Sequence, residues 1–135
     1  MIKQTFNNNI FLEIIDKLKK VKDCKLTANT LYAYMLSEDV FTYVSYNLEK
    51  MNGCLVLKRF IDNEGNTALL MLFIWIDPHF PKLLDDFNEL ANKKAKEVRA
   101  VKIYFVANRN EKAILRKTGK YGFKKAYTTY IKEMV

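Results

Sequence analysis

The sequence predicts a mixed α/β fold, with a mostly antiparallel sheet, one parallel crossover and helices on both faces. Three observations predict it. A turn over 62–66 joins two strands in the pattern of a hairpin. The second strand, Thr67 to Ile76, is apolar on both faces, so we expect it at the centre of the sheet. A helical stripe and a further strand, Val101 to Val106, then follow, and such a crossover makes the two strands parallel.

The N-terminal part predicts an edge strand and an amphipathic helix. We expect a short strand over Met1 to Phe6, and Asn8 or Asn9 can cap the helix by accepting a backbone N–H bond. The next apolar positions have helical spacing: Ile10, Phe11, Ile14, Ile15, Leu18 and Val21. The apolar face lacks tryptophan and acidic residues dilute the charge, which favours a helix on the core over one on a membrane.

The segment between this helix and the hairpin is only partly predicted. A second helical pattern starts at Thr27 and passes through Tyr34, and Ser37 to Asp39 breaks it. Residues 40–50 fit both strand alternation and helical spacing, so periodicity leaves the two alternatives open. The dipeptide Asn52-Gly53 predicts a turn.

The hairpin and the helix after it are the clearest unit. Its strands run from Cys54 to Ile61 and from Thr67 to Ile76, and Gly65 supplies a positive φ in the turn. Asp77-Pro78 ends the second strand, and Pro81 suits the first turn of a helix. The buried stripe of that helix is expected at Leu83, Leu84, Phe87, Leu90, Ala91 and Ala95.

The stretch VANRNEKAILRKTGKYGF, residues 106–123, predicts a strand end, an asparagine turn, a basic helix and an aromatic anchor. Asparagine tolerates turn geometry and can cap the helix. Gly119 or Gly122 can stop the helix with a left-handed residue, and Phe123 anchors the next strand to the core. A final strand over Ala126 to Met134 is expected to return antiparallel.

Length and composition indicate one intracellular domain spanning residues 1–135. The longest apolar run, Ala68 to Ile76, has nine residues, whereas a membrane span needs roughly 20. The first residues lack the layout of a signal peptide. Cys24 and Cys54 have no motif spacing, so we expect two free thiols, and with a single histidine we expect no metal site.

Charge is distributed unevenly along the chain. Residues 1–90 hold 10 basic and 12 acidic side chains, a net charge of −2, and residues 91–135 hold 13 basic and 3 acidic, a net charge of +10. Together they give the overall +8. The basic region over 91–125 therefore predicts an acidic protein surface or nucleic acid as partner, with a solvated lysine-rich face as the alternative.

The element order and the ending of the chain resemble the GNAT fold of acyl-CoA-dependent N-acetyltransferases. Members follow the fifth strand with Asn-x-x-Ala, a helix bearing a tyrosine, and Gly-Phe. Here Asn110 and Ala113 fit, and Gly122-Phe123 follows with one extra residue. In a second register Asn108 and Gly119 match instead. The resemblance covers residues 53–135 and implies acetyl-CoA as the cofactor of an active member.

The residues that would perform acyl transfer are missing from this pattern. The family's Arg/Gln-x-x-Gly-x-Gly/Ala loop, which brings backbone N–H groups to the cofactor diphosphate, corresponds to WIDPHFPKLLDDF, which has no glycine. Lys82 is its only lysine or arginine, and Asp85 and Asp86 repel phosphate. If the chain is an enzyme, Lys82 and Asn110 are the candidate cofactor-binding residues. No catalytic residue is assigned, although His79 is of a residue type that can act as a general base.

These observations predict a GNAT-fold protein that has lost acyl transfer and acts as a binding or structural component, without cofactor. It is similar to GNAT-like virion-associated proteins of short-tailed bacteriophages, which implies host cytoplasm or virion as its location. One alternative is an acetyl-CoA-dependent N-acetyltransferase with an atypical cofactor loop. Another is a basic nucleic-acid-binding module, whose affinity would fall steeply with salt. The oligomeric state, the partner and any acceptor substrate stay open.

Overall fold

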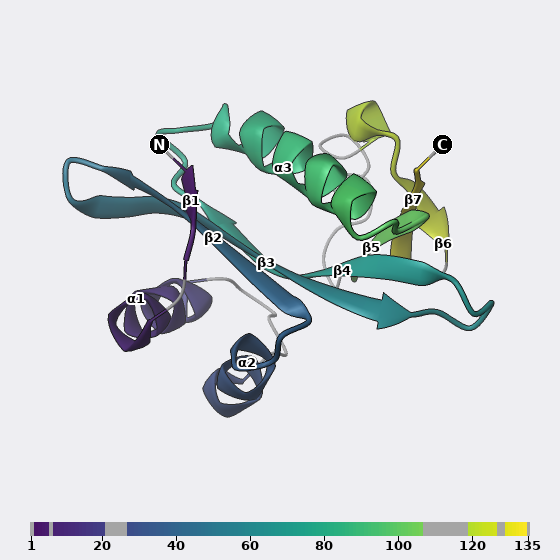
Figure 1. The fold of residues 1–135 in the computed structure, drawn as a ribbon. Coiled ribbons are helices and arrows are strands. Elements are labelled where there is room, and N and C mark those ends of the chain that lie inside the picture. The colour runs from purple at the N-terminus through teal and green to yellow at the C-terminus, as the bar shows by residue number, and fades with distance from the viewer. Residues whose placement is uncertain (1, 6, 21–26, 107–118, 127–128, 135) are drawn as a thin grey trace.

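The computed structural model describes residues 2–5, 7–20, 27–106, 119–126 and 129–134. Its strands form one seven-stranded sheet in the order β1-β2-β3-β4-β5-β7-β6. The elements are β1 (Ile2–Gln4), α1 (Asn8–Leu18), α2 (Ala28–Met35), β2 (Val40–Asn47), β3 (Lys50–Ile61), β4 (Thr67–Ile76), α3 (Leu83–Glu97), β5 (Lys102–Val106), the short 3-10 helix η1 (Gly119–Tyr121), β6 (Lys124–Ala126) and β7 (Thr129–Glu133). Figure 1 shows α3 on one face of the sheet and α1 and α2 on the other.

The predicted topology is confirmed. β4 and β5 pair in parallel, with Ala68 opposite Lys102 and Met71 opposite Phe105, and α3 forms the crossover between them. The other described strand pairs are antiparallel, including β5 with β7. A mixed sheet with one parallel pair, covered on both faces, is therefore the architecture of this chain.

Two apolar cores lie on the two faces of the central strands. Against α3 the core includes Leu55, Leu57, Leu69, Phe87 and Ile103. Against α1 and α2 it includes Ile14, Leu31, Val44, Val56 and Phe73. Because β3 and β4 contribute to both cores, they need apolar side chains on both faces, which explains their unbroken hydrophobic runs. The only cysteine among the described residues, Cys54, is a buried free thiol, and burial raises its pKa to about 12.

The ambiguous segment 40–50 is a strand and a tight turn. β2 and β3 are joined by Leu48 and Glu49, whose φ angles of 49° and 67° are those of a two-residue hairpin turn. The prediction of a turn at Asn52-Gly53 is therefore wrong, because both residues lie inside β3. Glycine is needed at 53 for packing: a Cβ there would lie 2.9 Å from the ring of Phe87 on α3.

Two helix starts differ from the prediction by small shifts. Asn7, rather than Asn8 or Asn9, caps α1, and its side-chain oxygen accepts from the Ile10 amide at 2.9 Å. Pro81 lies just before α3 instead of in its first turn, because Lys82 occupies the N-cap position. The predicted start of α2 at Thr27 is confirmed, and the Thr27 hydroxyl caps that helix.

The C-terminal segment contains two antiparallel strands instead of one. β6 and β7 pair with each other, and β6 forms the edge of the sheet beyond β7. Gly122 has a φ of 92° and Phe123 is buried against Phe105, as expected for a left-handed stop followed by an anchor. The predicted basic helix between them and β5 lies outside the described residues, as does Asn110.

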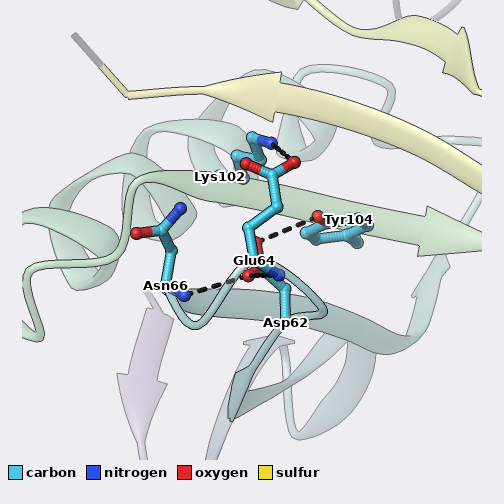
Figure 2. A network of polar contacts seen from close by, with 5 residues as sticks. All are labelled: Asp62, Glu64, Asn66, Lys102 and Tyr104. Atoms are coloured by element: carbon cyan, nitrogen blue, oxygen red, sulfur yellow. Dashed lines mark hydrogen bonds and ion pairs between the residues drawn. The ribbon is translucent and has the colours of Figure 1, made fainter.

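A polar cluster holds the β3–β4 turn to β5. Asp62 accepts hydrogen bonds from the amides of Glu64 and Asn66 and from the Tyr104 hydroxyl, and Lys102 pairs with Glu64 at 3.2 Å (Figure 2). The Asn66 amide and the other donors hold the pKa of Asp62 below its usual value. This end of the parallel pair is therefore fixed by side chains as well as by the sheet.

Candidate functional site at the junction of β4 and α3

The outer half of β4 separates from β5. Opposite β3, Phe73 pairs with Val56 and Met71 with Leu57, so Leu72 is an extra residue in the ladder. Pairing with β5 stops at Met71. A bulge bends the strand that carries it, and residues 73–76 pair only with β3 in the described part of the chain. β4 thus has an inner half with neighbours on both sides and an outer half with one.

The loop from β4 to α3 is built from consecutive turns. Its first amide, that of Asp77, donates to the Asn52 carbonyl at 2.9 Å, and the Phe80 amide donates to the Asp77 carbonyl. The next donors fold back on the loop: Leu83 to Phe80, Leu84 to Pro81, Asp85 to Lys82 and Asp86 to Lys82. The backbone donors at the start of α3 are therefore mostly satisfied by carbonyls of the loop itself.

The first turn of α3 carries its own anions. Asp85 and Asp86 both lie there. The Tyr121 hydroxyl of η1 donates to Asp85, and the Lys120 ammonium lies 3.5 Å from the same carboxylate. The bond from Tyr121 is the main cause that holds the pKa of Asp85 low, and Lys120 and Lys82 add to it. Carboxylates at a helix N-terminus complement the helix dipole. The positive end of the α3 dipole is therefore balanced by Asp85 and Asp86 of the same chain.

The predicted cofactor residues are not brought together in the described structure. Lys82 is exposed at the N-cap position and makes no side-chain cap. Asn110 lies outside the described residues, so its place relative to Lys82 stays a prediction. Tyr121, the tyrosine before Gly122-Phe123 in the GNAT-like ending, has its hydroxyl bound to Asp85.

His79 is exposed and held by its neighbour. Its Nδ1 lies 2.9 Å from the Asp77 carboxylate, which also accepts from the His79 backbone amide. These two bonds keep the pKa of Asp77 below its usual value. The contact with Asp77 orients the imidazole of His79. Because the His79 side chain is 88% exposed, this contact stabilises the local turn and does not by itself indicate a site.

A groove that sequence reasoning missed lies beside this junction. It has a volume of about 970 Å³ and is lined by α1, the β2–β3 turn and residues 75–80. Trp75 is part of its lining, and the ammonium groups of Lys17 and Lys20 lie 4.7 and 5.8 Å from the Trp75 ring centre. Only tertiary packing brings these segments together. A lone tryptophan at the end of an apolar strand is the single signal that was visible in the sequence.

Three cations of the described part of the basic region are paired with carboxylates. Lys94 contacts Glu97, Lys102 contacts Glu64 and Lys120 contacts Asp85. Each pair joins a cation of the predicted surface to a carboxylate, and two of those carboxylates come from the N-terminal part of the chain. The described basic surface is therefore less positive than its sequence suggests.

The described residues offer neither a metal site nor a membrane span. They contain no group of three or more His, Cys, Asp or Glu side chains arranged to hold a metal ion. None of their helices combines the length and apolar character that crossing a bilayer requires.

Comparisons with known proteins identify the fold. No family model and no curated protein matches the sequence. Among solved structures, a chain of the NatC complex bound to Gag peptide and CoA superposes with a TM-score of 0.82 at 13% identity, covering 100% of this chain and 98% of that chain. An acetyltransferase from Streptococcus agalactiae gives 0.79 at 16% identity, with 99% and 98% covered.

A GNAT-family acetyltransferase from Staphylococcus aureus gives a TM-score of 0.77 at 14% identity over the full length of both chains. Identities this low establish the fold alone. The described seven-stranded sheet, in which β4 and β5 are parallel, and these superpositions lead to one conclusion: this chain has the GNAT fold.

Proposed function

We propose that this chain is a GNAT-fold binding component that has lost acyl transfer. The observation that carries the proposal is the state of the α3 N-terminus. The amides of Leu83, Leu84 and Asp85 donate to loop carbonyls, and Asp85 itself holds Tyr121 and Lys120. A diphosphate needs several free amides and a positive helix end in the same place.

The cost of fitting a diphosphate here is both steric and electrostatic. Every residue from 66 to 118 has a side chain at Cβ, so the backbone has no glycine at which a phosphate could approach closely. The Lys82 amide is the one donor of this turn without a recorded partner in the described chain. Asp85 and Asp86 would also face the phosphate charge at short range.

Calorimetry and thermal unfolding with acetyl-CoA test the proposal together. We expect no saturable heat at submillimolar acetyl-CoA and no rise in Tm, because a ligand that does not bind the folded state cannot stabilise it. Circular dichroism of the same sample confirms that the protein is folded. A micromolar dissociation constant with a matching rise in Tm would show that the proposal is wrong.

The second candidate is an N-acetyltransferase with an atypical cofactor loop. The bulge at Leu72 favours it, because β4 still runs five residues, 72–76, beyond its last pairing with β5. The solved NatC structure, which has CoA bound, has the same fold. Transfer of labelled acetyl groups to a panel of peptide and small-molecule amines tests this candidate, and no transfer to any of them would exclude it for those acceptors.

A partner for the basic region 91–125 also stays a proposal. The sequence favours an acidic protein surface or nucleic acid, and Lys93, Lys96 and Arg99 are described cations without a recorded ion pair. DNA binding measured at rising salt separates the choices, because phosphate contacts weaken steeply as salt rises. A virion role rests on the resemblance alone, and mass spectrometry of purified particles would test it.

A further inference from the structure

The groove beside Trp75 is the strongest unassigned site among the described residues. Its lining includes four carboxylates and three ammonium groups, a net charge of −1 with His79 neutral; they are Glu13, Asp16, Glu49 and Asp77 against Lys17, Lys20 and Lys50. It also lies wholly within residues 12–80, in the part of the chain whose net charge is negative. The local field therefore favours a cation, although the whole protein is basic.

The side-chain oxygen of Asn52 is a second, independent indication of a ligand, because it is a buried acceptor without a hydrogen-bond donor in the described residues. It is the extra residue of a bulge in β3, between the pairs Ser45–Gly53 and Tyr46–Met51. Asn52 lines the groove and is 6% exposed, and its Oδ1 has no hydrogen-bond partner among the described residues. A buried acceptor without a donor is costly, and bulges commonly re-aim a side chain at a functional site.

The Trp75 ring already attracts cations from the chain itself. Lys17, at 16% exposure, is held between the ring and Asp16. Lys20 is 55% exposed, lies farther from the ring and reaches Asp16 only at 4.0 Å. Lys20 is thus a weakly held occupant that an external cation can displace at little cost.

We propose that this groove binds a guanidinium group, presented by an arginine side chain of a partner polypeptide. A planar guanidinium stacks on an indole face and donates several N–H bonds in one plane, which suits a floor made of Trp75, the Asn52 acceptor and nearby carboxylates. The inference goes beyond the proposed function, since it holds whether or not α3 accepts a cofactor.

Trp75 is the only tryptophan in the chain, so its fluorescence reports on the groove. The probe is N-acetyl-arginine N-methylamide, compared with the matching citrulline and lysine derivatives. We expect a saturable fluorescence change with arginine at a dissociation constant on the order of 1 mM, and weaker binding of the other two. No saturation with arginine, or equal binding of neutral citrulline or of lysine, would overturn the proposal.

Variants give the sharper test. Lys20→Ala removes the internal competitor, so arginine affinity should rise about two- to five-fold, the factor that one exposed cation–π contact carries. Lys19→Ala, an exposed lysine outside the groove lining, is the matched control and should leave affinity unchanged. A fall in affinity, or no change, for Lys20→Ala would contradict the proposal.

Asn52→Leu separates binding from folding. It removes the unpaired acceptor, so we expect an unchanged or higher Tm together with a several-fold loss of arginine affinity. Unchanged affinity in a folded variant would exclude Asn52 from the site. Failure of arginine binding leaves the acetyl-CoA experiment unaffected, because that experiment concerns α3 and not the groove.

Discussion

The two halves of β4 differ in how the chain holds them. Residues 68–71 pair with β3 on one side and β5 on the other, and the Asp62 cluster fixes the adjoining turn (Figure 2). Residues 73–76 follow the bulge at Leu72, pair only with β3 in the described chain and lead into the glycine-free loop. The inner half is therefore held on both sides, whereas the outer half is held on one side within the described residues.

The comparison separates what a fold requires from what a reaction requires. The backbone features of this sheet, the parallel pair of β4 with β5 and the bulge in β4, need only apolar strands and a crossover helix. A diphosphate site needs glycines and unpaired amides, and Leu83 to Asp85 have neither. A chain can therefore keep the strand pairing of the fold without keeping the glycines and unpaired amides of a diphosphate site.

Truncating one aliphatic residue in each half of β4 should give the largest difference in unfolding free energy. Leu69 is fully buried in the inner half, so Leu69→Ala should cost about 2–5 kcal/mol of unfolding free energy. Ile76, at the outer end, is only partly buried, and Ile76→Ala should cost about 1–2 kcal/mol. Urea unfolding measures both, and equal losses would contradict a difference between the halves.

Gly53→Ala should be the next largest effect. The new Cβ would lie 2.9 Å from the Phe87 ring and 3.0 Å from Leu83, so the contact between β3 and α3 must shift, at a cost of about 1–3 kcal/mol. A double-mutant cycle with Phe87→Leu checks the cause, because a smaller side chain relieves the clash. Additive losses would show that Gly53 is needed for another reason.

Removing the Asp62 carboxylate should have a smaller and pH-dependent effect. Its folded pKa lies below the unfolded value of 3.8, so its contribution is present above that pH and is lost as the pH falls through the folded pKa. Asp62→Ala should lower Tm by about 2–5 °C at neutral pH. The difference from wild type should shrink as the pH falls through the folded pKa of Asp62.

Asp62→Asn is the control for this experiment. It keeps an acceptor oxygen for the amides but removes the charge, so its Tm should lie between those of wild type and Asp62→Ala. If the difference between wild type and Asp62→Ala is the same at acid and neutral pH, the carboxylate charge is not what holds the turn.

Sequence patterns predicted the central elements because these depend on burial. The run Thr67 to Ile76 had to lie at the centre of a sheet, and Gly65 had to adopt a positive φ; both are confirmed. The dipeptide Asn52-Gly53 was misleading, because its glycine makes room for Phe87 and does not form a turn. The true turn, Leu48-Glu49, contains neither glycine nor asparagine, so it gives no turn signal.

The candidate sites could be predicted less completely than the fold. The absence of glycine at the β4–α3 junction was visible in the sequence, and so were Asp85 and Asp86. The contact of Tyr121 with Asp85 joins residues 36 positions apart, and the groove joins α1 to the end of β4. Such long-range contacts are set by tertiary packing and leave no local pattern.

The most direct test of the central claim is the response of individual amides to acetyl-CoA. In ¹⁵N-labelled protein, the amide signals of residues 82–86 report on the α3 N-terminus without assuming any activity. Because Leu83, Leu84 and Asp85 already donate to loop carbonyls, we predict that these signals do not move as acetyl-CoA is added in excess. Saturable shifts confined to these five amides would contradict the account and assign the cofactor to this helix.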